Sequence, residues 1–196
     1  MTLRKDATTS VPIHPLMQER WSPRAFDPQP IHLEELMACF EAARWAASSM
    51  NEQPWRFILI QRDAPEEFEK ALECLVPANR QWALRAGAIV FVLVKETFSR
   101  NGNPNAHARY DAGQAVAQFT LEAWNRGLVV HQMGGFTPDE VRKHFLVAEG
   151  HDPLVAIAIG KQGEPDVLNE PRKSWESSPR ERRSLSDTVL VAGGEK

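Results

Sequence analysis

Residues 42–60 read AARWAASSMNEQPWRFILI, and we expect this stretch to decide the fold because it ends a helix, crosses a polar turn and opens a strand. Pro54 cannot continue a helix and holds the residue before it in an extended conformation. The mostly apolar residues 55–60 predict a strand that enters the core. The turn carries short hydrogen-bonding side chains at Ser48, Ser49, Asn51 and Gln53. Such side chains between a buried helix and a buried strand favour a ligand pocket, and a helix cap followed by a plain turn is the alternative.

Hydrophobic periodicity on both sides of this stretch predicts further helices and apolar strands. Residues 55–61 are apolar on both faces, as in a strand covered by helices on both sides, so we expect this strand to be central. The helix at 110–125 is apolar around most of its circumference, so we expect it to be buried nearly all round, against this chain or a second subunit. The other expected elements are helices over 33–43 and 65–76, strands over 87–95 and 154–160, and a last strand over 185–191.

Length and composition indicate one globular domain. The 196 residues are 42% hydrophobic and 25% charged, which is enough for one large core over residues 15–191, with a flexible N-terminal leader at 1–14 and a flexible tail at 192–196. Residues 161–180 are polar and bear prolines, and we expect them not to pack internally. The net charge of -3 argues against nucleic acid as a partner. No apolar run suits a signal peptide or a membrane span, so we expect a cytoplasmic protein.

The cysteines and histidines predict no metal site. Cys39 and Cys74 stand singly in segments expected to be helical, without the close spacing of a zinc or redox pair, so we interpret them as buried thiols. The six histidines show neither an HExxH pattern nor the spacing of two histidines and a carboxylate.

An arginine-rich segment near the N-terminus suits an anion. Residues 20–24 read RWSPR, and Pro23 keeps Ser22 extended, so residues 20, 22 and 24 project to one side. Two guanidinium groups that flank a hydroxyl provide the charge and the donors that a phosphomonoester needs. A solvated surface loop is the alternative for this segment.

A pair of glycines follows the segment GLVVHQM at residues 127–133. Gly134 and Gly135 carry no side chain, so the backbone there can come close to a planar ligand. A simple turn before Pro138 is the alternative interpretation.

Four segments at these separations together resemble the FMN-dependent nitroreductase family. They read RWSPR at 20–24, AARWAASSMNEQPWRF at 42–57, GLVVHQMGGFTPDEVRKHF at 127–145 and RERRSL at 180–185. The resemblance implies an α+β fold with a mainly antiparallel sheet packed between helices. It also implies a homodimer in which each C-terminal strand is exchanged with the partner, and two FMN sites in the subunit interface.

The resemblance further implies which residues bind FMN. Arg20, Ser22 and Arg24 match the motif for the phosphate and ribityl chain, and the Arg24 position approaches and tunes the N1 and O2 edge of the ring. Asn79 matches the asparagine that pairs with the pyrimidine edge. The remaining matches are Arg182 and its neighbour Arg183 at the C-terminal phosphate position, Ala47, Ser48, Ser49, Asn51 and Gln53 in the segment that the other subunit contributes, and Met133, Gly134 and Gly135 beside flavin N5 and O4.

Three positions depart from the family pattern. Ala47 stands where proline is frequent, which should loosen the turn without removing a donor. Trp82 stands where some members have a lysine near flavin N1, so stabilisation of the reduced ring would depend more on Arg24. Ser184 replaces a common proline, and we expect little effect.

The function that the resemblance implies is electron transfer through FMN from NADH or NADPH to a small nitroaromatic or quinone acceptor. The two substrates would use one site in turn, a ping-pong reaction, and no side chain is assigned as catalytic acid or base. The alternatives are another reaction on the same scaffold, such as dehydrogenation, dehalogenation or flavin fragmentation, and a flavin-binding protein without catalysis. We expect the loop at 99–108 to influence access of the acceptor.

Overall fold

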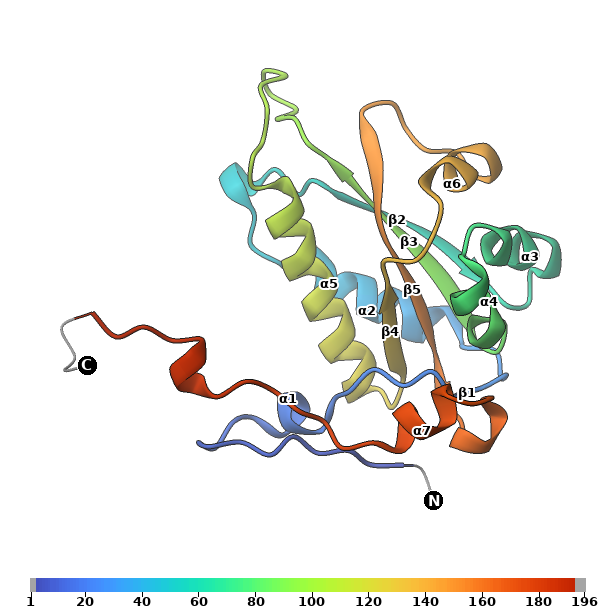
Figure 1. The fold of residues 1–196 in the computed structure, drawn as a ribbon. Coiled ribbons are helices and arrows are strands. Elements are labelled where there is room, and N and C mark those ends of the chain that lie inside the picture. The colour runs from blue at the N-terminus through green and yellow to red at the C-terminus, as the bar shows by residue number, and fades with distance from the viewer. Residues whose placement is uncertain (1–2, 193–196) are drawn as a thin grey trace.

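The computed structural model describes residues 3–192 as a sheet with helices on both faces (Figure 1). Residues 1–2 of the expected leader and 193–196 of the expected tail lie outside the described part. The helices are α1 (Pro15–Glu19), α2 (Leu33–Arg44), α3 (Pro65–Glu73), α4 (Pro77–Ala83), α5 (Ala108–Asn125), α6 (Pro138–His144) and α7 (Arg172–Ser177). The strands are β1 (Phe26–Asp27), β2 (Trp55–Gln61), β3 (Ala88–Lys95), β4 (Val129–Met133) and β5 (His151–Gln162), and 3-10 turns cover Ser49–Asn51, Pro165–Val167 and Leu185–Asp187.

The strands form one antiparallel sheet in the order β1-β5-β3-β2, and β4 also pairs with β5. Helices α2 and α5 cover one face, and α3, α4 and α6 cover the other (Figure 1). Phe119 of α5 is fully buried and its ring lies 5.1 Å from that of Phe40 in α2. The expected α+β fold, a mainly antiparallel sheet packed between helices, is confirmed.

Strand β2 lies at an edge of the sheet, so our expectation of a central strand is wrong. Its only strand partner within residues 3–192 is β3, whereas β3 and β5 each have neighbours on both sides. Phe57 and Leu59 pack against one core while Ile58 and Ile60 pack against the other. Helices on both faces therefore explain the apolar pattern, and that pattern does not report whether the strand edge is paired.

Helix α5 buries one side only, so the prediction of burial nearly all round is wrong for the single chain. Tyr110 is 71% exposed, and a Cβ at Gly113 would meet no atom within 4 Å. The sheet and α2 cover the opposite side, which carries Ala112, Ala115 and Phe119. The small residues on the open side made the helix seem apolar all round, but none of residues 3–192 covers them.

Residues 185–191 form no strand in the described chain, contrary to prediction. Leu185–Asp187 is a 3-10 turn whose capping box is made by Ser184 and Asp187. The following residues form an arm that extends away from the body, and Leu190 is 95% exposed (Figure 1). A strand needs a hydrogen-bonded neighbour, and the arm meets none among residues 3–192. Exchange of this segment with a partner stays a prediction.

Part of residues 161–180 packs against the body, which corrects the expectation that this segment does not. β5 continues to Gln162, Leu168 is 7% exposed, and Glu176 of α7 is 1% exposed. The expectation failed because α7 buries a charged residue, Glu176, and a polar composition does not indicate such burial. Residues 3–14 lack secondary structure, but Lys5 Nζ donates to the carbonyl oxygen of Glu176 at 2.9 Å and so joins the N-terminal segment to α7.

Cys39 and Cys74 are both fully buried, as predicted, and burial raises the pKa of each thiol to about 11. None of the helices within residues 3–192 combines the length and hydropathy needed to cross a bilayer.

Candidate functional site

Arg20 and Ser22 lie side by side in the extended segment between α1 and β1. Arg20 Nη1 donates to Ser22 Oγ at 3.2 Å, so the two side chains share a side, as their spacing predicts. Trp21, between them, points into the protein and is 5% exposed. The alternation therefore separates a core anchor from two polar groups that are free to meet a ligand.

Arg20 lies close to Arg180 and Arg182 from the C-terminal part of the chain, and these three residues form the arginine cluster. Burial lowers the pKa of Arg20 below its ordinary value, and the positive charges of Arg180 and Arg182 lower it further. Arg180 is held in place because its Nη1 donates to the carbonyl oxygens of Lys5 and Gln18, at 2.8 and 2.9 Å. Like charges brought together create a site of positive potential that favours an anion.

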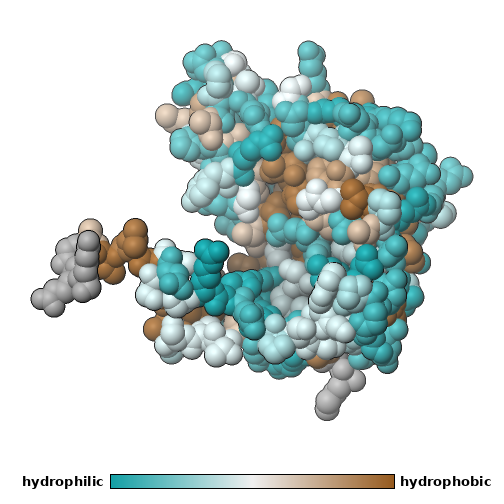
Figure 2. Space-filling view, in the orientation of Figure 1, coloured by the Kyte–Doolittle hydropathy of each residue, from teal (hydrophilic) through white to brown (hydrophobic). Residues whose placement is uncertain are grey.

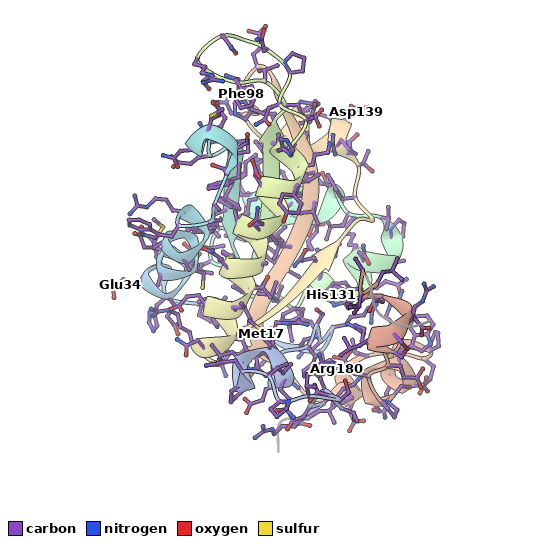
Figure 3. All side chains as sticks on the ribbon, turned by 90° about the vertical axis from the view of Figure 1, so that its left-hand side faces the viewer. Met17, Glu34, Phe98, His131, Asp139 and Arg180 are labelled. Atoms are coloured by element: carbon purple, nitrogen blue, oxygen red, sulfur yellow. The ribbon has the colours of Figure 1, made fainter. Side chains whose placement is uncertain are left out.

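The C-terminal arginines also line a groove. This groove, of about 830 Å³, runs between the N-terminal segment and residues 180–185, and Arg180, Arg182 and Arg183 lie along it. Arg183 itself is exposed. Met17 of α1 also lines the groove, and Figure 3 shows Met17 and Arg180 at the same end of the molecule.

The glycine pair lies beside the first turn of α4. Asn79 Nδ2 donates to the carbonyl oxygen of Gly135 at 3.0 Å, and the amide of Val76 donates to the same oxygen at 3.2 Å. A Cβ at position 135 would lie 2.7 Å from Asn79 Nδ2, so this contact requires glycine. Gly134 instead faces open space, and Met133 buries its side chain, so near these positions it is the backbone that a ligand can reach.

His131 of β4 connects the arginine segment to α4. Its Nδ1 lies 3.0 Å from the carbonyl oxygen of Ser22 and 3.1 Å from that of Pro23. Both carbonyls only accept, so Nδ1 carries the proton. The imidazole centroid lies 4.7 Å from the Trp82 ring of α4, and Trp82 is buried at 2% exposure. Burial, followed by the charge of Arg24, lowers the pKa of His131 to about 4.

Arg24 lies between the arginine cluster and the residues around α4. It is half-buried, and burial lowers its pKa while Glu176 opposes that change and Arg172 adds to it. Arg172 Nη2 donates to the carbonyl oxygen of Ala78, next to Asn79. A row of polar groups therefore runs from the arginine cluster through Ser22 and Arg24 to α4 and Gly134.

The turn at residues 48–53 is built separately, at the N-terminal end of α5 (Figure 1). Ser48 Oγ accepts from the amide of Gln53 at 3.0 Å, and Asp111 of α5 accepts from the amide of Ser49 at 2.9 Å. The backbones of Met50, Asn51 and Gln53 are left-handed, and Ala47 is exposed. The arginine segment lies beside α1, at the other end of α5, so one chain does not bring the two together.

His131 and Glu176 were not predicted from the sequence. Nothing in the sequence around them marked either side chain, because both act on a backbone more than 100 residues away. Arg180 was in the sequence RERRSL, but only its neighbours were assigned to a site. Within the described residues, no group of three His, Cys, Asp or Glu side chains is placed to hold a metal ion.

Comparison with known proteins identifies one family. The family model described as the nitroreductase family matches residues 17–161. The Major NAD(P)H-flavin oxidoreductase of Aliivibrio fischeri is 38% identical, with 91% of this chain and 99% of that protein covered. An uncharacterized 15.4 kDa protein of Mycolicibacterium smegmatis is 34% identical over 69% of this chain and 95% of its own.

One solved structure resembles the whole chain. It is described as an oxidoreductase containing FMN and superposes with a TM-score of 0.90 at 33% sequence identity. The match covers 100% of this chain and 99% of the other. The similarity therefore includes the N-terminal segment and the arginines near the C-terminus, beyond the residues that the family model matches.

Because His131 is neutral in the folded protein, we expect the free energy of unfolding to fall as the pH is lowered. The pKa of His131 is about 4 in the folded protein against an ordinary 6.5, so the unfolded chain binds the proton first. Its contribution is present above pH 6.5 and is lost as the pH falls toward 4, by about 2 kcal/mol between pH 7 and pH 5. In His131→Asn a side-chain amide replaces Nδ1 as the donor and does not titrate. The part of the stability loss that comes from His131 should therefore be absent in this variant. Urea unfolding at both pH values measures it, and an equal loss in both proteins would contradict the assignment.

Proposed function

The chain belongs to the nitroreductase family, and we propose that it is an oxidoreductase that binds FMN and takes electrons from NADH or NADPH. The names of its relatives support the cofactor and the reductant: one is an NAD(P)H-flavin oxidoreductase, and one solved structure is described as containing FMN. The observation that carries the proposal is the row of polar groups that begins at the arginine cluster and ends at Gly134.

The residues in this row suit the parts of FMN in order. Arg20, Arg180 and Arg182 provide the positive charge for a phosphate, and Ser22 adds a hydroxyl beside it. Arg24 follows one step along the extended chain, where it can place a positive charge at the N1 and O2 edge of the ring. Asn79 holds Gly135, and the open backbone at Gly134 would be available to N5 and O4.

The bound FMN would supply the chemistry by accepting hydride from the nicotinamide and giving electrons to a second substrate. The protein's own task is to hold the ring, tune it and leave one face open to both substrates in turn. Figure 2 shows apolar surface gathered over the sheet between α5 and α6, which suits a flat aromatic acceptor of the nitroaromatic or quinone type. No side chain is needed as a general acid or base.

The proposal includes a homodimer with FMN in its interface. One chain places Ala47, Ser48, Ser49, Asn51 and Gln53 at the far end of α5 from Arg20, so these residues can meet the same FMN only from the partner subunit. The open side of α5 and the apolar arm are surfaces that a second copy would cover. Exchange of residues 185–191 would give the arm the neighbouring strand that it lacks.

Absorbance of the purified protein tests the central proposal. We expect flavin bands, present on purification or after addition of FMN, that bleach when NADPH or NADH is added without oxygen. Bleaching follows because hydride transfer reduces the isoalloxazine ring. Bands that persist with both nicotinamides would indicate a flavin-binding protein that does not catalyse this reaction, and a protein that takes up no FMN would overturn the proposal.

Replacement of Arg24 by alanine should slow reduction more than it weakens binding. The guanidinium stabilises charge that develops on the ring, so we expect a loss of roughly 100-fold in the reduction rate by stopped flow. The dissociation constant for FMN should rise by less than about 10-fold, since the phosphate contacts remain. Arg126→Ala, at the end of α5, is the matched control. An unchanged reduction rate in Arg24→Ala would refute the role of Arg24.

A charge on the C-terminal arm should break the dimer. Leu190 and Leu146 are 95% and 97% exposed in the single chain, but we expect only Leu190 to be buried by a partner. Leu190→Asp would then bury a charge, and self-association measured by sedimentation velocity should weaken by at least about 10-fold. Leu146→Asp should leave it unchanged. A monomeric wild-type protein, or equal association in both variants, would contradict arm exchange.

A further inference from the structure

The backbone of residues 22–25 is held by side chains from two distant elements. Glu176 Oε1 of α7 accepts from the amide of Arg24 at 2.7 Å and from that of Ala25 at 2.8 Å. His131 Nδ1 of β4 contacts the carbonyl oxygens of Ser22 and Pro23. Amides are held from one side chain and carbonyls from another, so this extended segment keeps one conformation without belonging to the sheet.

Burial of the Glu176 carboxylate costs free energy, because a charged group loses its hydration. The residue is 1% exposed, and Oε2 has no hydrogen-bond partner within residues 3–192. Burial raises the pKa of its carboxyl group, while the two amides, Arg24 and Lys5 favour the charged form. A buried carboxylate gives little net stability, so its presence indicates a demand on position or charge.

The surroundings of Glu176 show what it connects. Lys5 Nζ donates to the backbone carbonyl of Glu176 and lies 4.6 Å from the ring centroid of Trp21. The chain continues from α7 to Arg180 and Arg182, the C-terminal members of the arginine cluster. Glu176 therefore lies where the N-terminal segment, the C-terminal segment and the arginine segment meet.

We propose that Glu176 is a positioning residue of the flavin site, which fixes the backbone of Arg24 through two amide hydrogen bonds and so aims the guanidinium. The inference rests on the proposed function and deepens it. Glu176 acts through Arg24 and touches no substrate. Because its carboxylate is bound to the backbone, the Arg24 side chain stays free for the ligand, which a direct ion pair with Glu176 would prevent.

Two substitutions of Glu176 separate the hydrogen bonds from the charge. Glu176→Gln keeps a carbonyl oxygen for the two amides, whereas Glu176→Ala removes every acceptor. In the protein without FMN we expect hydrogen exchange at the amides of Arg24 and Ala25 to be at least about 10-fold faster in Glu176→Ala and close to wild type in Glu176→Gln. The dissociation constant for FMN should rise about three- to 10-fold in Glu176→Ala, no more than removal of the Arg24 side chain itself would cause, and should stay within about twofold of the wild-type value in Glu176→Gln.

The midpoint potential of the FMN-saturated proteins separates positioning from mere stability. A displaced Arg24 stabilises the reduced ring less, so the potential of Glu176→Ala should be more negative than that of the wild type. The potential of Glu176→Gln should equal that of the wild type. Glu170→Ala is the control, because Glu170 accepts from Ser174 Oγ at 2.7 Å and its loss loosens α7 without touching the Arg24 amides.

The outcomes distinguish this inference from the proposed function. Faster exchange, weaker binding and a more negative potential in Glu176→Ala alone would establish the positioning role. Equal changes in Glu170→Ala, or a wild-type potential in Glu176→Ala, would overturn it while the proposed function stands. A wild-type protein that binds no FMN would overturn the proposed function and, with it, any flavin role for Glu176.

Discussion

The structure depends on how the extended segment at residues 20–25 finds hydrogen-bond partners for its backbone amides and carbonyls. Sheet pairing of this part of the chain begins only at Phe26, which is opposite Gln162 of β5. Before that point His131 contacts the carbonyl oxygens of Ser22 and Pro23, and Glu176 accepts from the amides of Arg24 and Ala25. Because one partner belongs to the sheet and the other to the C-terminal helix, the arginine positions are a property of the whole fold and not of the local sequence.

The single chain leaves several features unfinished on one side. In the described part of the chain, strand β2 has an unpaired edge, α5 exposes Tyr110, and the arm exposes Leu190. Unpaired edges and large exposed apolar groups favour association, and natural proteins usually cover them. These features agree with the proposed homodimer, in which a second subunit would cover them and complete the ligand site.

The sequence predicted what local patterns determine. Strands β2 and β3 and the core of β5 follow from runs of apolar and β-branched residues, and the shared side of Arg20 and Ser22 follows from the geometry of an extended chain. The edge position of β2 and the roles of His131 and Glu176 depend on contacts between distant parts of the chain, which periodicity does not encode. Most cofactor assignments came from resemblance to a family, since two arginines beside a serine suit many anions equally well.

The link between Glu176 and Arg24 has a consequence for biosynthesis. The two hydrogen-bonded residues are 152 positions apart, and Glu176 follows every strand from β1 to β5 along the chain. While the chain emerges from the ribosome, the sheet can form and His131 can reach Ser22, but the amides of Arg24 and Ala25 still lack their acceptor. A nascent chain therefore cannot complete its ligand site until α7 has been made, after all the strands from β1 to β5.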